Sequence, residues 1–356
     1  MSWFESRVLL LSFLVAVSGC KHVSEPPVVK NPREYTWTID TLAYPNSFQT
    51  SMRDIWGSSA NDVYVVGHND AGGYGKMYHY DGNRWRPVDL AFGAFDLSAI
   101  YGFSANDIWA VGNRFFYNPN PPPNFLDSSL IIHYDGAKWS EHKVSGGRNL
   151  LCIWGASPAD VWVGGQYGTL FHFDGSSWGK TPLAPTIHIG SLWGFASNDI
   201  YATAARTIDK VQPLDSSEYL LLHYDGIQCS VIDSFIEYPG YSGDKFGYSD
   251  LWGPSPSSLY SVSQGVFKKR GDSWERVLNT GSPFYGVFGS SSSNIFAVGM
   301  RSQVYHFNGT DWFRFPQFKG EDRFFSSLWT DGEQVFVVGN VIGAGYATIT
   351  LILHGK

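Results

Sequence analysis

One sequence unit recurs seven times along this chain, and the recurrence leaves few folds open to it. The first copy reads IWGSSANDVYVVG from Ile55 and continues as MYHYDGNRW from Met77. The second residues of successive copies lie about 36 to 59 positions apart, which brackets the 40 to 50 residues of propeller repeats. These second residues are Trp56, Tyr101, Trp154, Trp193, Trp252, Phe288 and Trp329.

Four short apolar or alternating runs, separated by turn residues, make up each copy. This pattern predicts a four-stranded antiparallel meander, whose strands we name a to d from the inside outward. Seven meanders around one axis protect most strand edges. We therefore predict an all-β chain that forms a seven-bladed β-propeller over residues 34–356. A neighbouring blade number is the alternative, because insertions can hide or mimic a copy.

The two ends of the repeat region test whether the ring closes. The seventh copy stops at Lys356 without a strand d. Residues 34–39 precede the first strand a and carry Trp37 where the first copy carries Trp85 in its strand d. We expect this N-terminal strand to pair beside the last strand c and complete the seventh blade. An open solenoid would need capping repeats instead.

Composition restricts the possible partners and chemistry. Hydrophobic residues make up 43% of the 356 positions and can bury a large core. The net charge is −7 and Lys and Arg form no clustered run, which excludes a nucleic-acid backbone as partner. Zinc-ligand spacing, a phosphate-binding loop and a nucleophile elbow are all missing from the sequence. We predict neither a metal site nor a cofactor.

Residues 1–19 have the organisation of an export signal. Arg7 supplies positive charge, residues 8–17 form an apolar stretch, and the small residues Ser18 and Gly19 follow. The stretch is shorter than the roughly 20 residues that span a bilayer, so a permanent transmembrane helix is the weaker interpretation. Residues 20–33 contain three prolines and are expected to form a semi-extended tether.

The run VSGC that ends at Cys20 resembles the lipobox of bacterial lipoproteins. This resemblance implies cleavage before Cys20, acylation of its thiol and new amino group, and anchoring to a membrane of the bacterial cell envelope. Lys21 stands where an Asp signals inner-membrane retention in lipoproteins, which favours the outer membrane. An ordinary secretory signal that contains a cysteine is the alternative.

The repeated WGxSxxDVWxVG and HYDGxxW segments resemble those of exported bacterial β-propeller proteins over nearly all of residues 34–356. The resemblance implies an architecture and no particular activity. The DGxxW part is also similar to the Asp-box of sialidase-type propellers. It lacks the residue that separates Asp from Gly in that box, so sialidase chemistry is not implied.

Most of the Trp, His and Asp residues that stand out occupy repeat positions and are expected to build blades. Trp is expected to pack within and between blades, and Asp before Gly to cap the c–d turn. Cys152 and Cys229 fall on an inner and an outer strand, too far apart for a disulfide, so we predict two free thiols. Structural hydrogen bonds rather than metal ligation are expected of His79, His133, His172, His223, His306 and His354.

Strand order also sorts the loops between two faces. In an antiparallel meander the a–b and c–d turns emerge on one face, the plain face, and the b–c and d–a connections on the other, the elaborated face. The long insertions, residues 113–128, 205–217 and 233–249, all fall on the elaborated face, where recognition is expected. The alternative is that their side chains only pack the loops onto the rim. The binding candidates are Phe115, Phe116, Tyr117, Arg206, Tyr238, Tyr241, Lys245, Phe246 and Tyr248.

Two classes of function remain open at this point. The favoured class is a non-catalytic binding or assembly module that holds a glycan or a protein partner on the elaborated face. The alternative is a glycan-processing hydrolase or lyase, with Asp54 and Asp250 as candidate catalytic carboxylates at the mouth of the axial channel. Glycoside hydrolysis needs two carboxyl groups about 5 to 9.5 Å apart, and equivalent positions four blades apart are expected to be farther. Arg53 and His188 are the other polar residues expected near the axis.

Overall fold

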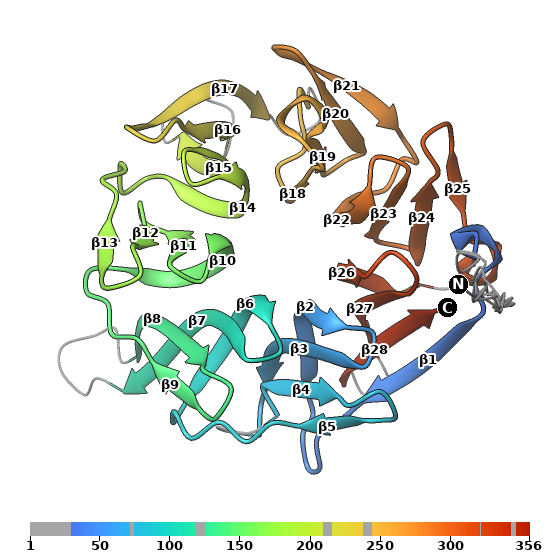
Figure 1. Cartoon of the computed structure of the whole chain (residues 1–356), viewed down its shortest axis with the longest axis horizontal. Helices are drawn as coiled ribbons and strands as arrows, with labels where there is room; N and C mark the ends of the chain where they lie inside the picture. Colours follow the sequence, from blue (N-terminus) through green and yellow to red (C-terminus); the bar gives the residue numbers. More distant parts are fainter. Residues whose placement is uncertain are drawn as a thin grey trace, which may run out of the picture.

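Seven four-stranded antiparallel sheets surround a central axis in the computed structural model (Figure 1). The structure describes residues 30–71, 75–117, 125–208, 216–237, 244–320, 322–342 and 347–356. The predicted all-β fold with seven blades is therefore confirmed. Within the described ranges, no helix is long and apolar enough to cross a bilayer.

Each blade runs from an inner strand a to an outer strand d. Blades 1 to 3 comprise β2 (Thr50–Ser59), β3 (Asp62–Asn69), β4 (Met77–Tyr80) and β5 (Trp85–Pro87); β6 (Phe95–Ser104), β7 (Asp107–Tyr117), β8 (Phe125–Tyr134) and β9 (Trp139–Glu141); and β10 (Arg148–Ser157), β11 (Asp160–Gln166), β12 (Leu170–Phe173) and β13 (Trp178–Lys180).

The remaining blades follow the same order. Blades 4 to 6 comprise β14 (His188–Ala196), β15 (Asp199–Ile208), β16 (Ser216–Tyr224) and β17 (Cys229–Glu237); β18 (Asp250–Trp252), β19 (Tyr260–Val262), β20 (Val266–Arg270) and β21 (Ser273–Leu278); and β22 (Phe284–Ser291), β23 (Asn294–Gly299), β24 (Gln303–Phe307) and β25 (Trp312–Arg314). Blade 7 comprises β26 (Phe324–Thr330), β27 (Val335–Ile342), β28 (Thr348–Gly355) and β1 (Trp37–Leu42).

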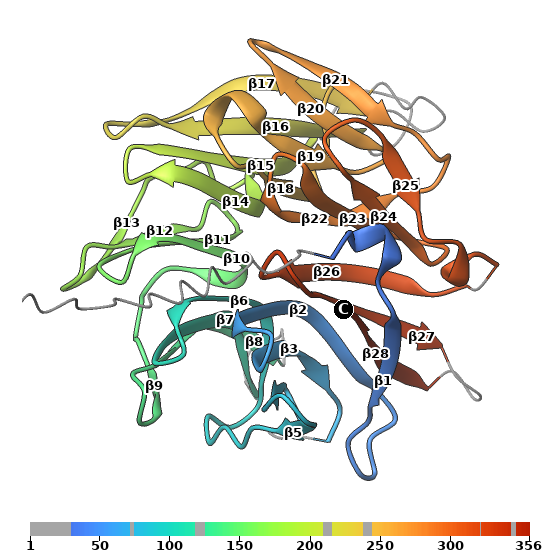
Figure 2. The same cartoon turned by 45° about the vertical axis from the view of Figure 1, so that its right-hand side comes forward.

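The N-terminal strand closes the ring as predicted. Strand β1 pairs antiparallel with β28, from Trp37 opposite Gly355 to Leu42 opposite Thr350, and the two strands lie side by side at the rim (Figure 2). The strand begins later than the predicted residue 34, because Pro32 opens a short 3-10 turn, η1 (Pro32–Glu34), ahead of it. The Trp37 indole packs edge-on against two aromatic rings of blade 6, so closure also joins the last two blades.

The glycine of the repeated WG pair allows neighbouring blades to approach closely. A Cβ atom on Gly102 would meet the Trp56 ring of blade 1 at 2.6 Å, and one on Gly194 would meet the Trp154 ring of blade 3 at 2.5 Å. Atoms that close would clash. The Trp rings of blades 1, 3, 5 and 7 therefore lie in the space that the glycine of the next blade leaves free, which explains why the two residue types recur together.

Each repeated histidine stacks on or packs against an aromatic ring of strand b and lies within hydrogen-bond distance of a polar side chain in the same blade. His133 stacks on Trp109 with ring centroids 4.0 Å apart, and its Nε2 lies 2.8 Å from Asp107 Oδ1. Blades 1, 3 and 4 repeat the His–Asp bond, and blades 6 and 7 use an amide partner instead. Blade 5 places Lys268 over the Tyr260 ring at 5.1 Å. The predicted structural role is confirmed.

The turn and thiol predictions also agree with the structure. Asp81 Oδ1 accepts hydrogen bonds from the backbone N–H groups of Asn83 and Arg84, which caps the c–d turn of blade 1. Blades 2 to 4 use the same cap. Cys152 and Cys229 are both free thiols. Burial raises the pKa of the Cys229 thiol to about 11, so neither its place nor its acidity makes it reactive.

Candidate binding face and axial channel

Where the structure describes them, the first two insertions on the elaborated face extend the hairpins of blades 2 and 4. Strands β7 and β8 stay paired as far as Tyr117 opposite Phe125, and β15 and β16 as far as Ile208 opposite Ser216. The prediction of loops over residues 113–128 and 205–217 was therefore wrong for the parts that pair. Aromatic and β-branched residues favour strands, so the strands continue into segments that were predicted to be loops.

Three of the predicted binding residues form an exposed aromatic tip on blade 2. The exposed fractions of Phe115, Phe116 and Tyr117 are 39%, 44% and 62%. All three residues belong to the paired extension of β7, and their aromatic side chains are exposed to solvent. We call these three residues the aromatic hairpin. Aromatic side chains of this kind are enriched where proteins bind one another.

Other predicted binding residues serve the scaffold instead. Phe246 is fully buried and packs edge-on against Phe235 at 5.0 Å, and Tyr248 stacks on Tyr219 at 3.6 Å. These two assignments to a binding surface are corrected: both side chains pack the junction of blades 4 and 5. The reason is that the chain between the blades turns inward here, which spacing alone did not reveal.

The charged candidates are paired within their own insertions. Arg206 Nε donates to Glu218 Oε2 at 2.6 Å across the β15–β16 ladder, and Lys245 Nζ donates to Asp233 Oδ1 at 2.7 Å. Both keep exposed guanidinium or ammonium surface, with 41% and 57% of their side chains accessible. Tyr238 and Tyr241, like the candidate lipidation site Cys20, lie outside the described residues.

An axial channel opens between the seven inner strands. It holds a cavity of about 310 Å³. An extra residue bulges from the inner strand of blade 1 between Met52 and Asp54, and corresponding shifts occur in other blades. The lining residues nearest the start of each inner strand, which we call the mouth ring, are Arg53, Ser98, Leu151, Gly190, Ser249, Tyr285 and Ser326. Two positions further along, the aliphatic ring consists of Ile55, Ile100, Ile153, Leu192, Leu251, Val287 and Leu328.

Asp54, one of the two candidate catalytic carboxylates, links three blades between these rings. Its Oδ2 accepts a hydrogen bond from the backbone N–H of Ile100 in blade 2 at 2.9 Å. Its Oδ1 accepts one from the Ser327 hydroxyl of blade 7 at 2.7 Å and one from the N–H of Ile55 at 2.9 Å. Burial outweighs these bonds and raises the pKa of Asp54 above its ordinary value.

Asp250 repeats this arrangement in blade 5. Its carboxylate accepts hydrogen bonds from the N–H of Val287 in blade 6 at 3.0 Å and from the Ser191 hydroxyl of blade 4 at 2.9 Å. Burial, with a smaller contribution from the charge of Asp54, raises the pKa of Asp250 to about 7 against these bonds. The described hydrogen bonds of both carboxylates therefore tie blades together, which accounts for their position without any reaction.

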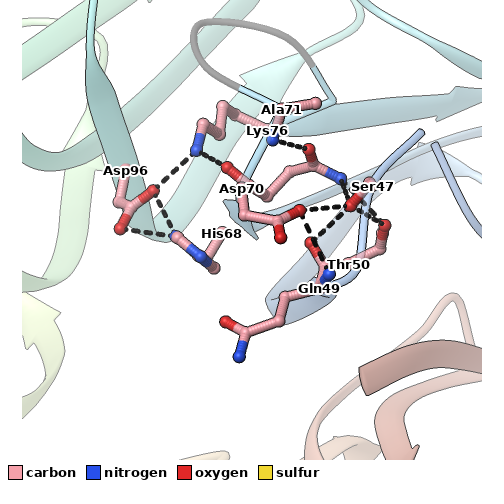
Figure 3. Close-up of polar contacts among 9 residues, drawn as sticks. Ser47, Gln49, Thr50, His68, Asp70, Ala71, Lys76 and Asp96 are labelled. Carbon is pink, nitrogen blue, oxygen red and sulfur yellow. Dashed lines mark hydrogen bonds and ion pairs between the residues drawn. The ribbon is translucent and has the colours of Figure 1, made fainter. Parts of the chain in front are cut away.

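A buried ionic network beside the aromatic hairpin was missed from the sequence (Figure 3). Asp96, at the start of β6, lies 2.8 Å from His68 Nδ1 and 3.0 Å from Lys76 Nζ, and both of those residues belong to blade 1. Lys76 also donates to the carbonyl of Asn69. Burial opposes ionisation of Asp96, but the contacts with His68 and Lys76 outweigh it and hold its pKa below the ordinary value.

This network gives the face of blade 1 a fixed shape. Lys76 and Asp96 are only 4% and 7% exposed, so their ion pair is held out of water. Next to it, Asp70 Oδ1 accepts a hydrogen bond from the Ser47 hydroxyl at 2.7 Å (Figure 3). It also accepts one from the N–H of Phe48 at 3.0 Å. These contacts hold the connection that precedes β2 next to the one that follows β3, both on the elaborated face. The network's only sequence signal was that these positions differ in type from one copy to the next.

Most of the exposed large apolar side chains of the described residues lie on connections of the elaborated face. Among the described residues, the exposed large apolar side chains on its connections are Phe48, Phe115, Phe116, Tyr117, Tyr167, Met300 and Ile342. The others are Ile227 in the c–d turn of blade 4, which lies on the plain face, Val231 and Ile232 in β17, and Ile39 in β1. Outside the aromatic hairpin these side chains belong to separate blades, and scattered single apolar residues are normal on a protein surface.

Comparison with known proteins identifies the fold and nothing narrower. No protein-family model and no curated protein sequence matches the chain. A solved structure described as YCF48 bound to D1 peptide matches with a TM-score of 0.60 at 14% identity, over 93% of this chain and 99% of that one. The WD40 β-propeller domain of Doa1 matches with 0.57 at 13%, over 90% and 97%.

The computationally designed Ika8 protein also matches, with a TM-score of 0.52 at 11% identity, over 86% of this chain and 97% of that one. At such identities the likeness shows the fold alone. Fold and surface together define the class of this protein: a seven-bladed β-propeller with one regular face and one elaborated face.

Proposed function

We propose that this chain is a non-catalytic binding module that holds an extended segment of a partner protein on its elaborated face. The seven blades serve as an internal comparison, because each strand a offers nearly the same backbone environment. The aliphatic ring contains only Ile, Leu and Val. The mouth ring, two positions away in the same strands, contains Arg, Ser, Leu, Gly and Tyr. Packing restricts the residue types of the aliphatic ring. Contact with a ligand is the best explanation for the variety of residue types in the mouth ring.

The aromatic hairpin and the mouth ring offer complementary contacts to such a segment. Phe115 and Phe116 provide apolar anchors, and aromatic anchors carry much of the energy in protein interfaces. Arg53 at the mouth is exposed and provides a charged contact near the axis. A similar propeller has been solved with a bound peptide, which supports a peptide rather than a glycan as the ligand.

The orientation of the chain supports a tether on the opposite side. Arg33 Nη2 donates to the carbonyl of Asp311, in the c–d turn of blade 6, at 2.7 Å. Lys30 Nζ donates to the carbonyl of Lys356 at 2.9 Å. Both contacts lie on the plain face. We propose that acylated Cys20 anchors the protein in the cell envelope, in the outer membrane, and that the elaborated face points away from the bilayer.

Site-specific photo-crosslinking in the native cell tests the binding face. The photoreactive residue p-benzoylphenylalanine replaces Phe116 on the elaborated face or, as the control, Asn106 in the exposed a–b turn of the same blade. We expect a discrete polypeptide adduct from position 116 and none from position 106. Equal adducts from both positions, or an adduct of carbohydrate, would contradict the proposal.

The anchor is tested separately by labelling with an alkyne analogue of palmitate. We expect label on the wild-type protein and on a Cys229→Ser control, but none on Cys20→Ser, which should also leave the membrane fraction. Retention of label by Cys20→Ser would show that Cys20 is not the lipidated residue.

A further inference from the structure

A second cavity lies on the outer side of the propeller, between blades 4 and 5. Its volume is about 520 Å³, within the roughly 300 to 1,000 Å³ of small-molecule pockets. It is separate from the axial channel, with which it shares no lining residue. The lining residues are Asp233, Asp244, Lys245, Phe267, Asp272, Ser273, Trp274 and Arg276.

The carboxylate of Asp244 is the unusual group in this cavity. Its side chain is 0% exposed, and within the described part of the chain neither of its oxygens accepts a hydrogen bond from another residue. Among the described residues, the charge that pairs with it is Arg276, whose Nη2 lies 3.6 Å away and whose guanidinium also lies over the Phe267 ring. Burial raises the pKa of Asp244 in spite of that guanidinium. A buried carboxylate without a hydrogen-bond donor destabilises a fold.

The other lining groups decide which ligand chemistry suits the cavity. Lys245 and Arg276 are donors, and Asp233, Asp244 and Asp272 are acceptors. A phosphate would be repelled by the three carboxylates. An ammonium group would be repelled by the two cations and would offer no acceptor to Arg276, whereas Lys245 already donates to Asp233. Hydroxyl groups both donate and accept, so a polyhydroxylated ligand satisfies both sets.

The indole of Trp274 adds an apolar wall to this polar set. It is half-buried in the cavity and packs against Phe246 with ring centroids 6.0 Å apart. A sugar ring combines an apolar C–H face with a rim of hydroxyl groups. We propose that this cavity is a saccharide-binding site, in which hydroxyl groups donate to Asp244 and accept from Arg276 while the sugar ring packs on Trp274.

The site is independent of the proposed peptide face, and its test uses full-length protein and named probes. Isothermal titration and saturation-transfer NMR would measure binding of maltose, cellobiose and diacetylchitobiose, with inorganic phosphate and ethylammonium as charged probes. We expect at least one disaccharide to bind and to lose about tenfold or more in affinity in Asp244→Asn and in Trp274→Leu. Trp178→Leu, at the corresponding position of blade 3, is the control and should bind as wild type does.

Stability gives a second readout that does not depend on choosing the right sugar. Because Asp244 is buried without a hydrogen-bond donor, Asp244→Asn should melt at the same or a higher temperature than wild type. A lower melting temperature would mean that Asp244 has a structural role and would overturn the proposal. So would the failure of all three disaccharides to bind, tighter binding of phosphate or ethylammonium, or disaccharide binding that survives both substitutions.

Discussion

The hydroxyl of Ser327 donates a hydrogen bond to Asp54 across 2.7 Å, although 273 residues separate the two in the chain. The bond joins the seventh blade to the first, and Asp54 continues the link to the N–H of Ile100 in the second. Ser191 and Asp250 repeat the relationship between blades 4 and 5. The two carboxylates that the sequence offered as catalytic candidates thus hold the inner wall of the ring together.

Removing these bonds should destabilise the propeller in a graded way. Ser327→Ala removes one bond to a charged group and is expected to lower the free energy of unfolding by about 1 to 2 kcal/mol. Asp54→Ala also leaves the N–H of Ile100 unpaired and should cost about 3 kcal/mol. Urea denaturation measures both values and their non-additivity in the double variant. Ser326→Ala is the control, because that hydroxyl makes only a 3.4 Å bond, and an equal cost for both serines would refute the link.

Asp250 should make the stability depend on pH. In the folded state its pKa is about 7, whereas an unfolded Asp titrates near 4. Between those values the folded state binds more protons, so the contribution of Asp250 is complete below about pH 4 and is lost as the pH rises through about 7. Relative to Asp250→Asn, the wild type should lose about 3 to 4 kcal/mol over that window. Urea melts from pH 4.5 to 8 measure this difference, and a difference that stays constant with pH would contradict the burial argument.

Closure of the ring should depend on the indole of Trp37 more than on the rest of its strand. Trp37→Ala empties the space against Phe315 and Phe318 and is expected to cost about 3 to 5 kcal/mol. Ile39→Ala, in the same strand but at a side chain 45% exposed, should change the free energy of unfolding by less than about 0.5 kcal/mol. If the two variants unfold alike in guanidinium, the closing strand does not stabilise the ring as described.

The repeat made the architecture predictable because every blade states the same pattern again. Trp109 and His133 recur as a pair whose spacing fixes two neighbouring strands, and Trp37 reveals the closing strand by analogy with Trp85. The candidate site was harder to predict from the sequence, because its residues depart from the repeat. Asp96 meets Lys76 across a blade boundary, and such a contact depends on side-chain directions that no single copy encodes. Phe246 was predicted to lie on the surface, but its side chain is fully buried.

We propose that the elaborated face binds the partner segment and that the plain face does not. The most direct measurement is the dissociation constant of the partner segment recovered by crosslinking, determined for a Phe115→Ala/Phe116→Ala/Tyr117→Ala variant. We predict a loss of at least about tenfold in affinity with an unchanged melting temperature. The control is Asn106→Ala/Lys138→Ala, two exposed positions on the plain face of the same blade, which should bind as wild type does. Wild-type affinity in the aromatic variant, or an equal loss in the control, would contradict the claim.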